Sequence, residues 1–339
     1  MGGKKHDIVE AALKEAEAYY QQHGTALTLR GLFYILVSKG IIPNTVSAYQ
    51  GLSKKLAKAR YDGGFPWHLL RDTTRRSIML EKKTWYPYRP LSAKELRSIL
   101  ENYIKNYTDV SVNPWEDQPH RIIVVVEKEA LGDLVAKFIE EVWQHGVYAV
   151  RVIRGYDSAT DIYLLAEAIT FLPENQIPVV LQLGDYDPSG EDIVRDLRER
   201  LMMLSKRTDI IFEKVAVTLD QIIEMQLPAK PESLEEVEKM RRDPRYKGYI
   251  EKLNSLAQQD ERVKRLIDMY GSPEIRVELD ALVALQPERF KQVLKNSIEK
   301  YFDLNIYNTK TKQREEELKK KAEEYRQKTM EEMKKLVTS

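Results

Sequence analysis

Apolar side chains recur at helical spacing through the first sixty residues, in three runs separated by short polar turns. The pattern predicts helices over residues 7–20, 25–38 and 44–60. Thr28 is placed to open the second of them as its N-cap. Arg30 and Tyr34 lie four residues apart and therefore on one side of that helix, flanking its apolar stripe. Three helices with two short turns are typical of a helix-turn-helix or winged-helix module.

Beyond residue 120 the pattern changes to continuous apolar runs that alternate with amphipathic ones. The apolar runs predict strands over 121–126, 148–153, 178–183 and 212–217. Helices are predicted between them, over 130–145, 158–171 and 190–204. Apolar strands that alternate with helices indicate a parallel sheet covered on both faces. Such sheets bind ligands at the carboxyl ends of their strands.

Prolines and charge mark the domain boundaries. At 339 residues the chain is long enough for about two domains. Prolines at 87, 90, 114 and 119 bracket a segment with one predicted helix, 93–107, and place a boundary near 119. From Lys310 the chain is almost all Lys, Glu, Arg and Gln, as in a long exposed or partner-binding helix. We therefore expect a helical domain over 1–90, a linker over 91–117, a sheet domain with its extension over 118–308, and a charged helix over 309–339.

Composition removes several function classes. The chain has no cysteine, which excludes disulfide frameworks, zinc-thiolate and iron-sulfur sites, and cysteine nucleophiles. No secretory signal pattern opens it, and no apolar run approaches the roughly 18 residues of a membrane span. We expect a cytoplasmic protein with no membrane partner. Balanced charge at 32% of residues, with no cysteine, is also frequent in thermophile proteins.

The overall charge is +1, but one segment is strongly basic. Residues 51–90 hold ten basic and three acidic side chains, interleaved with the aromatic residues Tyr61, Phe65, Trp67, Trp85, Tyr86 and Tyr88. Cations meet phosphates and aromatic rings stack on bases, so this segment is the expected contact with double-stranded DNA. The candidate contacts are Lys54, Lys55, Lys58, Arg60, Arg71, Arg75 and Arg76. A solvated basic face is the alternative.

Carboxylates follow the first and third predicted strands. Glu127 ends the first strand, and Asp185 and Asp187 come directly after the third, 58 residues beyond Glu127. Because parallel strands end at a common edge, we expect the three acids to converge there. Hard oxygen donors without thiolate or clustered histidine suit Mg²⁺, with Mn²⁺ as a second choice. Alternatively Asp187 only caps the helix entered at Pro188, and Glu127 is a solvent contact at the strand end.

The segments VVVEKEA and GDYDPSG together resemble the Toprim domain of topoisomerases, primases and overcoming-lysogenization-type nucleases. These two motifs are most similar to those of the A subunit of topoisomerase VI and its meiotic double-strand-break relative. The resemblance implies an α/β chain, with an N-terminal winged-helix (CAP-like) domain before a Toprim Rossmann-like parallel sheet that has helices on both faces. It also implies that Glu127, Asp185 and Asp187 are the Mg²⁺ ligands, and residues 154–158 resemble the family's glycine-containing turn beside the site.

The same family carries an R-D-x-Y/F-Y pattern whose last tyrosine attacks DNA. Arg30-Gly31-Leu32-Phe33-Tyr34 stands in the corresponding place, with Gly31 where the family has an acid, in a chain shorter than most A subunits. The resemblance implies that Tyr34 is a nucleophile forming a 5′-phosphotyrosyl link and that Arg30 holds the phosphate or helps to activate the phenol. The alternative is a helix tyrosine at the margin of the helical core.

These features predict an enzyme that makes double-strand breaks by Mg²⁺-dependent tyrosine transesterification, associated with the nucleoid. A homodimer is expected, with Tyr34 of one protomer facing the acids of the other, including Glu127 as a catalytic group. No phosphate-binding G-x-x-x-x-G-K-[ST] motif is present, so a topoisomerase cycle would need a separate ATPase subunit. Two alternatives remain open: a Toprim nuclease that uses an activated water, and a catalytically silent DNA-binding dimer. Glu278 and Asp280, in a strand-like run over 276–282, are interpreted as supporting or surface residues, with an approach of one of them to the metal as the alternative.

Overall fold

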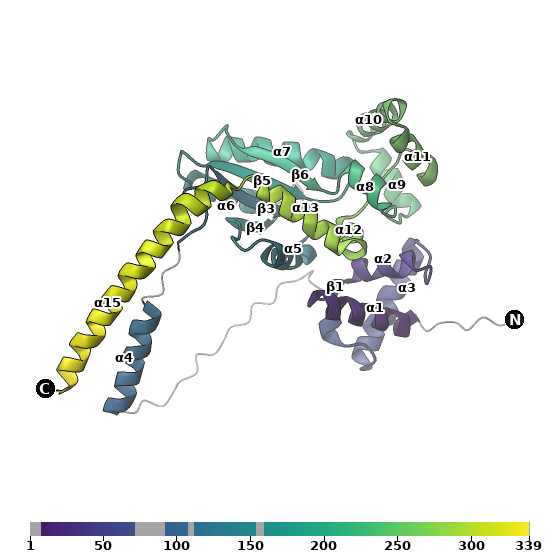
Figure 1. Ribbon diagram of the computed structural model, residues 1–339. Coiled ribbons are helices and arrows are strands. Elements are labelled where there is room, and N and C mark those ends of the chain that lie inside the picture. The colour runs from purple at the N-terminus through teal and green to yellow at the C-terminus, as the bar shows by residue number, and fades with distance from the viewer. Residues whose placement is uncertain (1–7, 72–91, 108–111, 154–158, 339) are drawn as a thin grey trace. The chain divides into compact units, whose positions relative to one another are not determined.

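The computed structural model describes residues 8–71, 92–107, 112–153 and 159–338 (Figure 1). The chain divides into two compact units. One joins Met1–Arg75 to Arg121–Tyr301, and the other joins Arg76–His120 to Phe302–Ser339. The sequence predicted a linker over 91–117 and a separate C-terminal helix, whereas the second unit combines these two segments.

The three predicted N-terminal helices are present. They are α1 (Ile8–His23), α2 (Leu29–Ser38) and α3 (Val46–Tyr61). Thr28 caps α2 as predicted, and Thr45 caps α3, each side chain accepting a hydrogen bond from a backbone N–H of the first turn. The core between these helices holds Leu32, Leu36, Leu52 and Leu56, all at most 2% exposed.

A winged helix is not confirmed by this part of the chain. Two-residue strands, β1 (Leu27–Thr28) and β2 (Leu70–Arg71), flank the helices, and a 3-10 turn η1 (Trp67–Leu69) leads into β2. The two strands pair in parallel, whereas a wing is an antiparallel hairpin. Residues 72–91, where the sequence leaves room for a wing, lie outside the described part.

The predicted parallel sheet is found in the first unit. Its strands are β3 (His120–Val126), β4 (Ala149–Val152), β5 (Ile177–Leu183) and β6 (Ile211–Ala216), in the order β4-β3-β5-β6. The crossover helices are α5 (Glu129–Val142), α6 (Ala159–Thr170) and α7 (Pro188–Ser205). All of them lie within a few residues of the predicted bounds.

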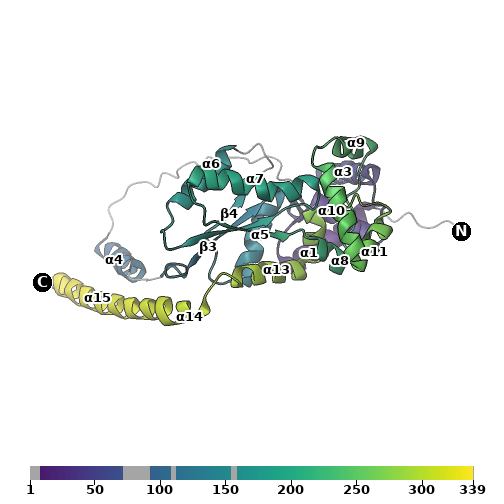
Figure 2. The same cartoon turned by 90° about the horizontal axis from the view of Figure 1, so that it is seen from above.

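Helices cover both faces of this sheet, as Figure 2 shows. On one face, Ile123, Val125 and Val180 pack with α6 and α7 in a single buried cluster. On the other, α5 packs against α13 (Pro287–Glu299), with the rings of Phe138 and Phe290 6.3 Å apart. The arrangement is compatible with a Rossmann-like sheet.

After β6 the chain is helical. The elements are α8 (Leu219–Met225), α9 (Leu234–Arg241), α10 (Tyr246–Gln259), α11 (Glu261–Tyr270) and α12 (Leu279–Leu285). The strand-like interpretation of 276–282 is therefore wrong for most of its length, because only Val277 forms an isolated antiparallel bridge, with Tyr186. The apolar run instead faces α2: a Cβ on Gly31 would lie 3.2 Å from Cβ of Ala284. This close approach leaves little room for a side chain at position 31.

The second compact unit is built from two segments far apart in sequence. It holds α4 (Ala93–Tyr107), α14 (Leu304–Ile306), the π-helical turn η2 (Tyr307–Thr311) and α15 (Lys312–Thr338), and α4 contacts α15. The rings of Trp115 and Phe302 stack edge to face, and the Gln118 side chain exchanges two hydrogen bonds with the backbone of Asp303. Among the helices of the described residues, none is both long and apolar enough to cross a bilayer.

Candidate functional site: an acidic sheet edge joined to a buried ion network

The structure brings the predicted acids to one edge of the sheet. Glu127 directly follows β3, and Asp185 and Asp187 follow the neighbouring strand β5. The backbone N–H of Asp185 donates a 3.3 Å hydrogen bond to Oε2 of Glu127. Gly184 permits this approach, because a Cβ there would lie 2.6 Å from the same carboxylate oxygen. The prediction that these strand ends meet is therefore confirmed.

Of the three acids, Glu127 has the fewest stabilising contacts with the protein. Burial, and then the negative charges of Asp185 and Asp187, raise its pKa to about 7. The weak bond from Asp185 N–H is the one hydrogen bond found for this carboxylate within the described residues. Glu127 is therefore a carboxylate with little hydrogen bonding from the protein.

Asp187 caps α7, as the simpler interpretation predicted. Its Oδ1 accepts hydrogen bonds from Gly190 N–H and from the Ser189 hydroxyl, both at 2.7 Å. Burial alone would raise its pKa, but these two bonds hold the pKa below its ordinary value. Both bonds use Oδ1, which leaves Oδ2 as an oxygen that another ligand can use.

Asp185, by contrast, is fully engaged by the protein. Its Oδ1 accepts the backbone N–H of Leu279 at 2.8 Å, and its Oδ2 lies 3.1 Å from Nζ of Lys128. The side chain is buried at 9% exposure. Asp185 therefore anchors the start of α12 and a lysine, in addition to standing beside Glu127.

Lys128 is the centre of a buried ion network. Besides Asp185, its ammonium lies 2.9 Å from Oδ2 of Asp280 and 3.4 Å from Oε1 of Glu278. Burial disfavours the ammonium, but the three carboxylates outweigh burial and hold the pKa of Lys128 well above its ordinary value. The lysine is thus a fixed cation surrounded by three acids.

Glu278 connects this network to α2. Its Oε2 accepts a 2.7 Å hydrogen bond from the Tyr34 hydroxyl and lies 3.0 Å from Nε of Arg30. Asp280 makes a parallel link, since its Oδ1 accepts a 2.7 Å bond from the hydroxyl of Thr28. Both acids are 4% exposed, so the interpretation of Glu278 and Asp280 as surface residues is wrong and the supporting role holds.

Tyr34 is completely buried, at 0% exposure. Burial, then the Glu278 carboxylate, raise its pKa far above the ordinary tyrosine value, and Arg30 opposes this only in part. The sequence placed Tyr34 at the margin of the helical core and opposite the acids of a second protomer. The structure places it inside the core, bonded to Glu278 of its own chain. The phenol in this conformation is neither accessible nor ionised.

The donor set fits a divalent cation through two carboxylates. Within the described ranges, no group of three or more acidic, histidine or cysteine side chains converges as a metal site, so the predicted three-ligand set is not formed. Mg²⁺, however, commonly uses one or two carboxylates and completes its shell with water and substrate phosphate. Glu127, with one weak hydrogen bond, and Asp187, with both of its bonds on Oδ1, are the acids of this edge that have oxygens to offer. Asp185 remains with Lys128.

The basic candidates fall into three groups. Lys54, Lys55 and Lys58 are exposed on α3. Arg60 instead lies 4.3 Å above the ring of Trp67 and donates to the carbonyls of Trp67 and Leu70, so its guanidinium is engaged in holding the turn before β2. Arg71 lies in β2, whereas Arg75 and Arg76 fall outside the described residues, as do Trp85, Tyr86, Tyr88 and the turn over 154–158.

The aromatic residues of the basic segment divide in the same way. Tyr61 and Trp67 are 83% and 55% exposed and form an edge-to-face pair beside the lysines of α3. Phe65 is buried at 1% exposure and belongs to the helical core. The exposed pair with Lys54, Lys55 and Lys58 is thus the part of the predicted nucleic-acid surface that the described residues retain.

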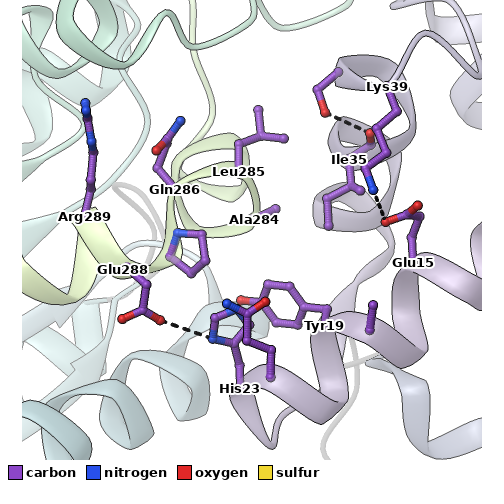
Figure 3. Close-up of a pocket in the computed structure, with 14 residues that line it drawn as sticks. Glu15, Tyr19, His23, Ile35, Lys39, Ala284, Leu285, Gln286, Glu288 and Arg289 are labelled. Carbon is purple, nitrogen blue, oxygen red and sulfur yellow. Dashed lines mark hydrogen bonds and ion pairs between the residues drawn. The ribbon is translucent and has the colours of Figure 1, made fainter.

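A pocket of about 470 Å³ lies away from the acidic edge, between α1, α2 and the start of α13 (Figure 3). The ammonium of Lys39 donates a 2.6 Å hydrogen bond to Glu15 in this pocket, and Nδ1 of His23 lies 3.5 Å from Oε1 of Glu288. The predicted acids are not among its lining residues. The acidic edge is therefore the candidate site.

Sequence reasoning missed Lys128 as the organising cation. A signal was present, because a lysine between two glutamates directly after a buried strand must lie at the sheet edge with the acids. Its partners 150 and 152 residues later, Glu278 and Asp280, carried no comparable local signal.

Comparison of the chain with protein-family models, with curated proteins and with solved structures gives no match.

Proposed function

We propose that this protein cleaves DNA by metal-dependent hydrolysis at the carboxyl edge of its sheet, as a Toprim-type nuclease. The observation that carries the proposal is the meeting of Glu127, a half-buried carboxylate, with Asp185 at the carboxyl ends of β3 and β5, where Asp187 also lies. Glu127 and Asp187 would hold a divalent cation there. Double-stranded DNA is the proposed substrate, with α3 as its contact surface.

The roles of the residues follow from their contacts. Glu127 and Asp187 would hold the cation, and a cation there would supply charge neutralisation at the phosphate. Asp185 keeps the loop between Gly184 and Asp187 in place by holding Lys128 and Leu279 N–H. Water is the proposed nucleophile, because the hydroxyl of Tyr34 is buried against Glu278.

A second candidate is tyrosine transesterification, as in the A subunit of topoisomerase VI. The observation that favours it is that Arg30 and Tyr34 both contact Glu278. Glu278 and Asp185 in turn both contact Lys128, so the tyrosine is connected to the acidic edge. Transesterification requires Tyr34 to leave Glu278 and reach the DNA. In a homodimer, two such sites would cut the two strands, and an ATPase subunit would drive a topoisomerase cycle.

One experiment separates these candidates. Supercoiled plasmid is incubated with the full chain and Mg²⁺ or Mn²⁺, denatured in detergent and analysed with and without protease, using wild type, Glu127→Gln and Tyr34→Phe. Glu251→Gln is the control, because Glu251 is an exposed acid on α10.

Hydrolysis predicts protein-free cuts that persist in Tyr34→Phe and disappear in Glu127→Gln. Protein-linked linear DNA that requires Tyr34 would instead establish the transesterase. Retention of DNA without any cleavage would contradict both and leave a silent DNA-binding protein.

A further inference from the structure

A pocket of about 480 Å³ opens directly beside Asp187. One wall is the start of α7, with Asp187 and Ser189, and the other comes from α9 and the chain around it, with Lys239, Arg242 and Arg276 among the lining residues. Nothing in the sequence pattern singled out this pocket, because α9 belongs to the helical segment after β6. Its position makes it a neighbour of the proposed cation ligand.

The acidic groups of this pocket are already satisfied by local partners. Glu236 accepts hydrogen bonds from both the backbone N–H and the hydroxyl of Ser233, and the two residues form the capping box of α9. Asp243 holds the guanidinium of Arg245 with both oxygens, at 2.8 and 2.6 Å. These carboxylates therefore have little capacity left for a ligand cation.

The basic groups, in contrast, have unused donors. Nε of Arg276 is buried and has no hydrogen-bond partner in the described part of the chain, although Nη1 pairs with Glu232. Within the same residues the ammonium of Lys239 forms no hydrogen bond or ion pair, and Arg242 makes one exposed 3.4 Å contact with Glu238. A buried donor without an acceptor is unfavourable, so the pocket suits a ligand that brings acceptor oxygens.

The start of the 18-residue helix α7 also borders the pocket. The N–H groups of Gly190 and Glu191 already donate to Asp187, so this helix end contributes its dipole and not a free donor. The exposed cations Lys239 and Arg242, with Arg276 beside them, therefore favour an anionic group with several oxygens.

We propose that this pocket binds a phosphate group of the nucleic acid, next to the bond cleaved at Glu127 and Asp187. The inference rests on the proposed function for its choice of substrate, because the pocket borders the cation ligand Asp187. A backbone phosphate held by Lys239 and Arg242, with Arg276 lining the same pocket, fixes the strand relative to the acids. Free phosphate carries the same chemistry, and the experiment distinguishes the two sources.

The test compares two double variants that remove the same charge. Lys239→Ala/Arg242→Ala empties the pocket of its exposed cations, and Lys247→Ala/Arg265→Ala removes two exposed cations of α10 and α11 outside it. Affinity for a fluorescein-labelled DNA duplex is measured by anisotropy in EDTA over a range of salt concentrations. Without metal no cleavage interferes, and both variants retain Arg276 and its buried ion pair.

We expect the pocket variant to bind roughly fivefold to tenfold more weakly than the control variant. Its salt dependence should be shallower by about one unit of log–log slope for each phosphate that the pocket no longer neutralises. Equal weakening in both variants would overturn the proposal. Calorimetry with inorganic phosphate identifies the source. If wild type releases or absorbs heat with phosphate and the pocket variant does not, free phosphate also binds the pocket. If the pocket variant loses only duplex affinity, the pocket is assigned to the DNA backbone.

The experiments can reject the phosphate-pocket proposal and the hydrolase proposal independently of each other. If wild type does not cleave plasmid but the pocket variant selectively loses DNA affinity, the hydrolase proposal is wrong and the phosphate pocket stands. If wild type cleaves and both double variants bind alike, the pocket is wrong and the hydrolase stands.

Discussion

The hydroxyl of Tyr34 donates a 2.7 Å hydrogen bond to Oε2 of Glu278, a residue 244 positions later in the chain. Because Glu278 also contacts Arg30 and Lys128, this bond connects α2 to the cation that holds Asp185. The helical N-terminal part and the sheet edge are thus joined by one buried network. Tyr34 therefore acts as a buried hydrogen-bond donor in this network.

Replacing Tyr34 with Phe tests the strength of this link. The variant removes one hydrogen bond to a charged acceptor, while Arg30 and Lys128 still compensate Glu278. We expect the free energy of unfolding to fall by about 1–3 kcal/mol. Urea denaturation measures it, with Tyr61→Phe, at an 83% exposed position, as the control. A Tyr34→Phe protein as stable as that control would contradict the buried bond.

Replacing Lys128 is expected to lower the free energy of unfolding more than replacing Tyr34 does. Lys128→Met leaves three buried carboxylates without their shared cation, and breaking a buried ion network by removing one partner lowers stability by about 3–5 kcal/mol. Lys247→Met, at an 86% exposed lysine, is expected to change little. Lys128→Arg restores the charge and should recover part of the loss in the same urea experiment. Equal stability of the Lys128→Met and Lys247→Met proteins would show that the carboxylates relax into water.

The fold was largely predictable from sequence because its signals are local. Strand and helix alternation depends on neighbouring residues, and Thr28 as a helix cap can be recognised from the residues beside it. The acidic edge was also predictable, since Glu127 and Asp185 each follow an apolar strand and parallel strands end together. Both inferences use geometry that any chain with this pattern must follow.

The burial of Tyr34 was not predictable, because it depends on α12 packing against α2. Periodicity placed Tyr34 beside the apolar stripe, and nothing near it in sequence indicates that Glu278 lies 2.7 Å away. The run containing Glu278 looked like a strand since seven apolar-rich residues fit either element. Packing across more than 240 residues decided both outcomes.

Glu127 predicts an unusual pH dependence of stability. Its pKa is about 7 in the folded protein against 4.5 for an ordinary glutamate. Between these values the folded state keeps a proton that the unfolded state releases, so stability falls as pH rises through the window. Glu127→Gln lacks this loss and should exceed wild type by up to about 3 kcal/mol at pH values above about 7, with the difference fading toward pH 4.5.

Urea denaturation in EDTA across that pH range measures the difference between the two proteins. Glu251→Gln, an exposed position on α10, controls for the chemical change from carboxylate to amide. A difference between Glu127→Gln and wild type that is the same at every pH would contradict the raised pKa.

Divalent cations should stabilise the protein through Glu127 and Asp187 rather than through Asp185. A ligand that binds only the folded state adds about 2.7 kcal/mol at a hundred times its Kd, so Mg²⁺ should raise the Tm of wild type above that in NaCl of equal ionic strength. Glu127→Gln and Asp187→Asn should lose this rise, although asparagine still caps α7. Asp185→Asn, in contrast, should keep it, because both oxygens of Asp185 are engaged by Lys128 and Leu279 N–H. Loss of the Mg²⁺ response in Asp185→Asn alone would show that the cation displaces Lys128 and binds Asp185 directly.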